Sequence, residues 1–447
     1  MAGIRRNSRA LVRAVAGALA WISFAALAAD EAAPAVDAAP EVPPVSRLRL
    51  NGFATFGVVD SRMDAPWVFR RDSLQPGGPH GGIRSRVDSR LGLQANLALT
   101  ERLDAVVQTV LKPMPDAAPE SQRIEWALLS YRPAADWTLR AGRVSTDMRL
   151  VSEYTNVGFA YPWVRPIPEM YGLLSISSVD GMDVQKAWTR GAARWRAKLQ
   201  LGQTDMHAPT PSGDPLTVKG RDMLALTLQR EDGGLLLKAN VTWTQIAFDT
   251  DLGAQPLLDA LGRLRQLPIP SVSREATALA SRLPIEPLSA RYVSVGLQYQ
   301  SGPWLTHAEL AVSDIRQTGD SDVSAYASVG YRFGAVTVFG MTGAVSPRQQ
   351  AVQAPTTWAA ALAPLLGPAD AAAAQGAGAV AAAVGNAVRI DQRSLSVGMR
   401  WDVHPQVALK AQVDHIRVGA NGAALWWRGT PDARSGNVLS FVVDTVF

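Results

Sequence analysis

The chain contains no cysteine among its 447 residues. This absence excludes disulfide bonds, thiolate-bound zinc and a cysteine nucleophile, so hydrogen bonds and packing must stabilise the fold. Beyond the first thirty residues there is also no run of eighteen strongly apolar residues, the usual mark of a membrane-spanning helix. The nearest approach is the uncharged stretch 371–388, which is almost entirely Ala and Gly and gains little from transfer into lipid. We expect that stretch to be a long loop.

The chain also has little net charge once its first segment is set aside. Residues 1–29 have the pattern of a signal peptide, in which basic residues precede an apolar run that ends at Ala26-Leu27-Ala28. The basic residues of this segment are Arg5, Arg6, Arg9 and Arg13. Removing these four positive charges from the formal net charge of +5 leaves +1. The mature chain therefore lacks the dense basic face that nucleic-acid binding requires, and no nucleic-acid partner is expected.

Residues 30–46 form a tract of Pro, Ala and acidic residues with few large apolar side chains. Such a composition cannot bury enough apolar surface to fold, so we expect a disordered N-terminal tail. From residue 47 the composition changes, and 47–447 is expected to form one domain.

Apolar and polar residues alternate over this domain in segments of about ten to fifteen, the length that a tilted strand needs to cross a bilayer. In 90–99, for example, Leu91, Leu93 and Leu97 alternate with polar positions, so that one face suits lipid and the other water. Counting such segments gives about sixteen strands, an even number that allows the sheet to close. The expected fold is all-β, a closed antiparallel transmembrane β-barrel.

The connections between these segments alternate in length. Short ones are expected at 100–102, 133–136, 190–191, 231–234, 301–303, 334 and 404–405, and long ones near 61–84, 113–121, 146–179, 205–219, 248–288, 315–320, 347–387 and 419–436. Aromatic residues lie within a few positions of the short turns, where an interfacial girdle should sit: Tyr131, Trp137, Trp188, Trp195, Tyr299, Trp304, Tyr331 and Trp401.

The last segment, GNVLSFVVDTVF, places Phe441 and the terminal Phe447 on one face of a final strand. In strand pattern, turn asymmetry and aromatic end, the chain resembles Gram-negative outer-membrane porins over essentially all of 47–447. The resemblance implies a passive diffusion channel, a bacterial outer-membrane location, a periplasmic tail at 30–46, a homotrimer, and recognition of Phe441 and Phe447 by the barrel assembly machinery.

In porins the third outer loop folds into the lumen, and the third long connection here is 146–179. We therefore expect a constriction in which three prolines limit backbone freedom and aromatic side chains supply rigid bulk. The candidate residues are Tyr161, Trp163, Arg165, Glu169 and Tyr171. The alternative is that this segment packs over the barrel mouth or against a neighbouring subunit. The acidic cluster that is common on the third outer loop of general porins is not expected in 146–179.

The positions that alternation turns inward are more often basic than acidic, which predicts a preference for small anionic solutes. Arg194, Arg196 and Lys198 form a ladder on one strand, with Arg140 also inward. Their side chains are roughly 7 Å apart, a spacing suited to passing a carboxylate or phosphate along. The alternative is that these charges only hydrate the lumen wall.

Other functions have less support in the sequence. A hydrolase on a barrel needs a nucleophile with a nearby base, and none of the five histidines belongs to such a signature. No pair of histidines has metal-ligand spacing, so no metal or other cofactor is implied. A plugged or adhesive barrel, whose outer loops bind a partner, is the remaining alternative. The segment LLDALGRLRQL within 248–288 has a short helical periodicity and could cap the mouth.

Overall fold

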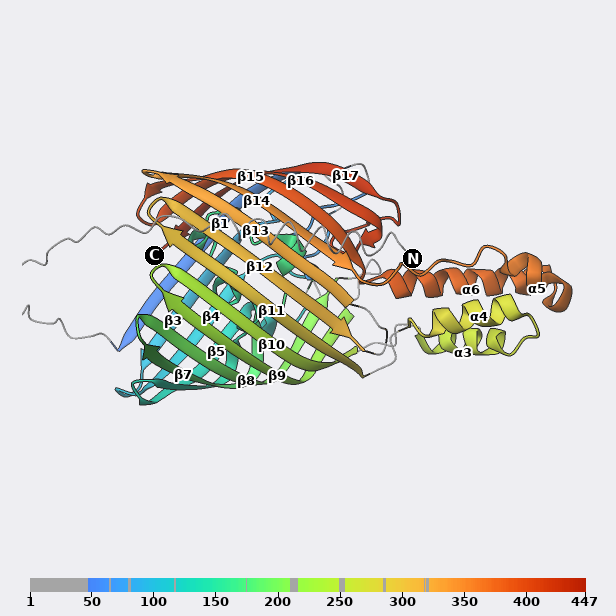
Figure 1. Ribbon diagram of the computed structural model, residues 1–447, viewed down its shortest axis with the longest axis horizontal. Helices are drawn as coiled ribbons and strands as arrows, with labels where there is room; N and C mark the ends of the chain where they lie inside the picture. The colour runs from blue at the N-terminus through green and yellow to red at the C-terminus, as the bar shows by residue number, and fades with distance from the viewer. Residues whose placement is uncertain are drawn as a thin grey trace, which may run out of the picture.

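The computed structural model describes residues 47–447 except 64–65, 79–81, 116–117, 174, 210–215, 249–253, 284–286, 317 and 319–320. Its strands form one antiparallel sheet that closes on itself through the pairing of β1 with β17 (Figure 1). The strands are β1 (Leu48–Arg62), β2 (Gly82–Arg84), β3 (Arg90–Ala98), β4 (Leu103–Leu111), β5 (Ile124–Ala134), β6 (Trp137–Ser145), β7 (Ser178–Arg190), β8 (Ala193–Ala208), β9 (Leu216–Asp232), β10 (Leu235–Phe248), β11 (Leu288–Ser301), β12 (Trp304–Ile315), β13 (Ser321–Phe333), β14 (Val336–Pro347), β15 (Ile390–His404), β16 (Val407–Ala423) and β17 (Arg434–Val446).

The short strand β2 pairs with the outer half of β1, and β3 pairs with its other half, so β2 and β3 together occupy one position in the sheet. The barrel therefore has sixteen transmembrane strand positions, which confirms the predicted fold. An even count returns the two ends of the sheet to the same end of the barrel, as closure of a single-chain barrel requires.

The two faces of the wall differ as the alternation predicts. Apolar residues such as Leu199, Val397 and Phe441 are exposed on the outside, where lipid replaces water. Polar residues between them, such as Lys198 and Gln200, face the lumen and are buried there. Because side chains alternate strictly along a strand, one register places a continuous apolar band against the bilayer.

All seven predicted short turns connect consecutive strands at one end of the barrel. Glycines with positive φ make several of these turns possible, for example Gly191 (62°) and Gly334 (59°). Aromatic rings gather at the same end, where Trp188 stacks on Trp195 at 6.1 Å between ring centroids. The long connections all lie at the other end, so the predicted division into short turns at one end and long loops at the other is confirmed.

The two longest outer connections do not cap the barrel and are not irregular. They form helices α3 (Ala254–Arg265), α4 (Pro270–Ala280), α5 (Trp358–Leu366) and α6 (Pro368–Asn386), which extend away from the outer rim (Figure 1). We name these four helices the outer lobe. Their shared core includes Leu261, Val272, Trp358 and Leu362. The prediction of a long loop at 371–388 was therefore wrong, because alanine has the highest helix propensity of any residue and here has a partner to pack against.

Shorter helical turns lie in the other connections: η1 (Glu120–Arg123), η2 (Ser152–Tyr154), η3 (Gly158–Ala160) and α2 (Pro168–Tyr171). Within the described part of the chain, no helix combines the length and apolar character needed to span a membrane. The predicted signal peptide and the tail at 30–46 lie outside the described residues.

Candidate functional site: a loop folded into the lumen

The connection between β6 and β7 folds back into the barrel. We name residues 146–177 the inner loop. Its neck is closed by two hydrogen bonds: the Thr146 amide donates to the Ser177 carbonyl (3.1 Å), and the Thr146 hydroxyl donates to the Ile176 carbonyl (2.7 Å). Between these residues the inner loop contacts lumen-facing side chains of β3, β8, β10, β12, β13, β16 and β17. The inner loop thus crosses the lumen and is held around most of its wall.

The first anchor of the inner loop is electrostatic. Asp147 and Glu153 of the inner loop meet the cations of β8: Arg196 lies 3.3 Å from Asp147 and 3.4 Å from Glu153, and Lys198 lies 3.3 Å from Glu153. Lys238 on β10 also pairs with Asp147. The loop carboxylates therefore neutralise much of the basic wall that they cross.

Glu153 is strongly affected by this environment. Burial favours its neutral form, but the positive charges of Lys198, Arg196, Lys238 and Arg140 outweigh burial and lower the pKa of Glu153 to about 2. The carboxylate thus stays ionised at any physiological pH. Arg140 itself pairs mainly with Asp183 on the neighbouring strand (2.8 Å) and reaches Glu153 at 3.8 Å.

The second anchor is Arg165, which is only 1% exposed. Its guanidinium lies 2.6 Å from the Asp88 carboxylate and 3.2 Å from Asp414, and it donates to the Ser440 hydroxyl at 2.6 Å. Burial lowers the pKa of Arg165, but the two carboxylates outweigh burial and raise it overall. The guanidinium group carries its N–H donors in a rigid planar arrangement, and here most of them are directed at two carboxylates and a hydroxyl. This side chain therefore fixes the inner loop against β16 and β17.

A third anchor holds the inner-loop backbone. The Lys410 ammonium on β16 donates to the carbonyls of Gly158 (2.6 Å), Tyr161 (2.7 Å) and Trp163 (2.9 Å), and pairs with Asp444 at 2.8 Å. The loop passes very close to the wall here. A Cβ atom on Gly158 would lie 2.0 Å from the Asp444 Oδ1 atom, so only glycine fits.

Aromatic side chains fill the space between the anchors. Tyr161 stacks on Trp163 at 5.8 Å, and Trp163 meets Tyr326 of β13 edge to face at 5.8 Å. The polar atoms of Trp163 and Tyr161 are satisfied: the Trp163 indole donates to the Ser328 hydroxyl at 2.7 Å, and the Tyr161 hydroxyl accepts from Arg90 at 2.9 Å. This is an apolar core inside the barrel, built from one loop and the lumen wall.

The remaining candidates also face the wall. Glu169 is buried and accepts a hydrogen bond from the Gln392 amide at 2.9 Å. Burial raises its pKa, which the hydrogen bond from Gln392 only partly offsets. The Tyr171 hydroxyl donates to the Glu309 carboxylate, and the Arg149 guanidinium lies over its ring at 4.8 Å.

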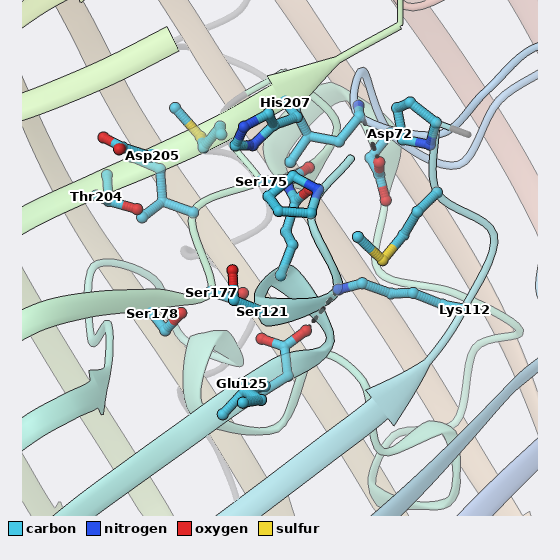
Figure 2. A pocket seen from close by; sticks show the side chains of 18 of the residues that line it. Asp72, Lys112, Ser121, Glu125, Ser175, Ser177, Ser178, Thr204, Asp205 and His207 are labelled. Carbon is cyan, nitrogen blue, oxygen red and sulfur yellow. Dashed lines mark hydrogen bonds and ion pairs between the residues drawn. The ribbon is translucent and has the colours of Figure 1, made fainter. Parts of the chain in front are cut away.

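A polar cavity of about 310 Å³ lies at the outer end of the barrel, beside the neck of the inner loop. Lys112 and Glu125, joined by an ion pair of 2.6 Å, lie on one side of it, and His207 from the end of β8 lies on the other (Figure 2). Arg143 and Asp180, which also line it, are paired at 2.7 Å. The cavity is therefore polar, and these charges are compensated by one another. Among the described residues no group of three or more His, Asp or Glu side chains could hold a metal ion.

The five residues predicted in the constriction are brought together, but all are buried against the wall. Their contacts fix the inner loop to the wall, and none of the five presents an exposed group to the lumen. In the predicted ladder, Arg196, Lys198 and Arg140 are paired with carboxylates and only Arg194 is exposed. The statement that the loop lacks an acidic cluster was wrong, because Asp147 and Glu153 converge on the ladder. Alternation located the cations, but no local pattern in the sequence shows that these acids reach them.

The family described as Gram-negative porin matches residues 281–421 of the chain. No curated protein matches it. Among solved structures, the outer membrane channel DcaP of Acinetobacter baumannii is 13% identical, with a TM-score of 0.49, and the match covers 90% of this chain and 97% of that one. The anion-selective porin from Comamonas acidovorans is 11% identical, with a TM-score of 0.49, and the match covers 90% of this chain and 99% of that one.

The closed sixteen-position barrel, with an apolar outer band and a loop inside its lumen, defines a transmembrane β-barrel channel. The family match makes residues 281–421 similar to Gram-negative porins.

Proposed function

We propose that this barrel is a Gram-negative outer-membrane porin, a diffusion channel that passes small hydrophilic anions through a constriction formed by the inner loop. The path of the inner loop supports this constriction. The loop contacts the surrounding barrel both near its start, through Asp147, and well beyond its middle, through Arg165. A loop held at several points by buried ion pairs and an aromatic core is rigid, and a rigid loop sets a fixed opening.

The anion preference is supported by the charges that the loop leaves unpaired. Arg49 on β1, Arg194 on β8 and Arg332 on β13 face the lumen near its periplasmic end, and all three are exposed. Within the described chain, none of them has a carboxylate within 4.0 Å. Glu231 lies opposite Arg194 on β9 but does not reach it at that distance.

Two other lumen-facing acids at the same end are compensated. Asp104 pairs with Arg132 at 2.5 Å, and Asp402 pairs with Arg400 at 2.7 Å. The three free arginines belong to strands spread around the barrel, so they form a sparse positive ring. Such rings raise the local concentration of anions and repel cations. This ring is the observation that carries the proposal.

The proposed anion preference can be tested by measuring reversal potentials of the refolded protein in planar bilayers under a salt gradient. Wild type should be anion-selective, and replacing Arg49, Arg194 and Arg332 together by Gln should bring the permeability ratio of anion to cation close to one. The matched control for Arg194→Gln is Arg230→Gln, because Arg230 lies on the adjacent strand and faces lipid. Cation selectivity of wild type, or an unchanged ratio in the triple variant, would contradict the proposal.

The homotrimer and the assembly role of the C-terminal strand are further proposals. The Phe447 amide and carbonyl pair with Gly52 at 3.0 and 2.7 Å, so the last residue takes part in closing the barrel. Deletion of Phe447 should lower the yield of folded barrel in outer membranes but not its refolding in detergent. Light scattering of the purified protein measures the oligomeric state, and a monomer would contradict the trimer.

A further inference from the structure

A cluster of unpaired basic residues lies on the lipid-facing side of the wall. Arg393 on β15 and Arg417 on β16 are exposed and are direct cross-strand neighbours. Directly opposite residues have Cβ atoms about 5 Å apart, and like charges in such pairs destabilise a sheet. His415, two positions from Arg417 on the same face, completes the cluster.

Three other arginines at this outer edge of the lipid-facing surface have an acidic residue paired with them or directly opposite. Arg143 pairs with Asp180 at 2.7 Å, and Arg291 lies directly opposite Asp314. Arg62 pairs with Asp60 at 2.9 Å. Arg393 and Arg417 instead face each other, and neither has an ion pair within the described residues.

The nearest outward carboxylate is Asp391, two positions further out on β15. Its side chain is turned towards the turn at the end of β16, where a Cβ atom on Gly419 would lie 2.5 Å from the Asp391 Oδ2 atom. It does not come within ion-pair distance of Arg393 or Arg417. The charge of the cluster is therefore not cancelled locally.

The cluster is also held in a defined orientation. The Arg417 Nε atom donates to the His415 Nε2 atom at 3.3 Å, and the His415 Nδ1 atom lies 2.8 Å from the Asn437 side-chain oxygen. With Nε2 accepting, Nδ1 carries the ring proton and donates to Asn437. This chain of hydrogen bonds uses only the Nε donor of Arg417 and leaves the two terminal nitrogens of its guanidinium available.

The position of the cluster indicates which part of the membrane contacts it. Directly below it, towards the membrane centre, the outward residues of the same strands are apolar: Leu395, which is 61% exposed, is followed by Val397, and Val413 lies beside them. A lipid whose chains cover this band brings its headgroup to the level of the arginines. Two guanidinium groups side by side suit the oxygens of a phosphate group, which can bridge both.

We propose that Arg393 and Arg417, with His415 positioning Arg417, bind the phosphate of an anionic lipid headgroup in the outer leaflet. The bound phosphate relieves the repulsion between the two arginines. The cluster is thus a specific lipid site at the junction of β15 and β16.

The experiment uses the whole porin in nanodiscs of phosphatidylcholine, with phosphatidic acid as the probe and native mass spectrometry to count bound lipid. Wild type should retain phosphatidic acid in preference to phosphatidylcholine. The double variant Arg393→Gln/Arg417→Gln should bind it about tenfold or more weakly, as loss of charge-assisted hydrogen bonds to one phosphate predicts. The control Arg143→Gln/Arg291→Gln removes two charges from the same edge and should bind as wild type does.

Stability gives a second and independent readout. Without anionic lipid, the double variant should unfold at a higher temperature than wild type, because the like-charge pair is gone. With phosphatidic acid the order should reverse, since a ligand stabilises only the form that binds it. Equal binding by the two double variants, an unchanged order of stability, or displacement of the lipid by inorganic phosphate alone would each overturn the proposal.

Discussion

Arg165 provides the sharpest test of how the inner loop is held. Arg165→Gln removes one buried cation and leaves the buried carboxylates of Asp88 and Asp414 without their ion-pair partner. Removing one member of a buried ion pair costs about 3 to 5 kcal/mol, because the remaining charge stays buried. Since 1.4 kcal/mol corresponds to a factor of ten, the ratio of attached to detached loop should fall by roughly a hundredfold to several thousandfold. The strands keep their own hydrogen bonds, so the loop should detach while the barrel stays folded.

Single-channel recording measures this directly. Wild type should show steady conductance, whereas Arg165→Gln should show a larger mean conductance with frequent transitions as the loop leaves the wall. The matched control is Arg194→Gln, which also removes one lumen charge but breaks no ion pair. Adding Asp88→Asn and Asp414→Asn to Arg165→Gln removes the stranded charges and should restore part of the steady behaviour. If Arg165→Gln conducts as steadily as wild type and its loop is equally resistant to protease, the anchoring argument fails.

Three further predictions follow from the inner loop and the outer lobe. The pKa of Glu153 is lowered to about 2, so the ionised carboxylate stabilises the attached inner loop fully above the ordinary carboxyl pKa of 4.5, and this stabilisation is lost as pH falls towards 2. Conductance noise should therefore rise as pH falls from 4.5 towards 2. In Glu153→Gln the same noise should be present already at neutral pH. Burial raises the pKa of Glu169, so ionisation of this carboxyl group destabilises the folded barrel as pH rises through that raised pKa; Glu169→Gln cannot ionise and should lose less thermal stability than wild type between acid and neutral pH, and an equal loss would contradict the argument. Leu261→Ala in the lobe core should cost about 2 to 5 kcal/mol locally, making the lobe protease-sensitive while the heat-dependent gel mobility of the barrel stays unchanged.

The barrel could be predicted from the sequence because strand periodicity is local. Alternation such as that of 90–99 fixes which side chains face lipid, and each short turn is marked by its own residues. The same holds for the inward direction of Arg196 and Lys198, which the structure confirms.

The partners of these residues could not be predicted in the same way. The contact of Arg196 with Glu153 joins positions 43 residues apart, and that of Arg165 with Asp414 joins positions 249 apart. Both depend on the path of a loop through the lumen, and such a path has no periodic signal. The helices of the outer lobe were missed for a related reason. The side chains of 371–388 are mostly Ala and Gly, which gives no apolar pattern that predicts a packed helix, and the helices that pack against this stretch lie in another loop.

That dependence of one loop on another has a consequence for how the outer surface can vary in sequence. The outer lobe joins 254–280 to 358–386, and its contacts include a hydrogen bond from the Trp358 indole to the Glu275 carboxylate at 2.8 Å. A substitution at Leu261 or Trp358 therefore changes the fit of a helix more than eighty residues away in the chain. In any barrel that keeps the lobe, these two loops should accept changes in compensating pairs, and they should be gained or lost as a single unit.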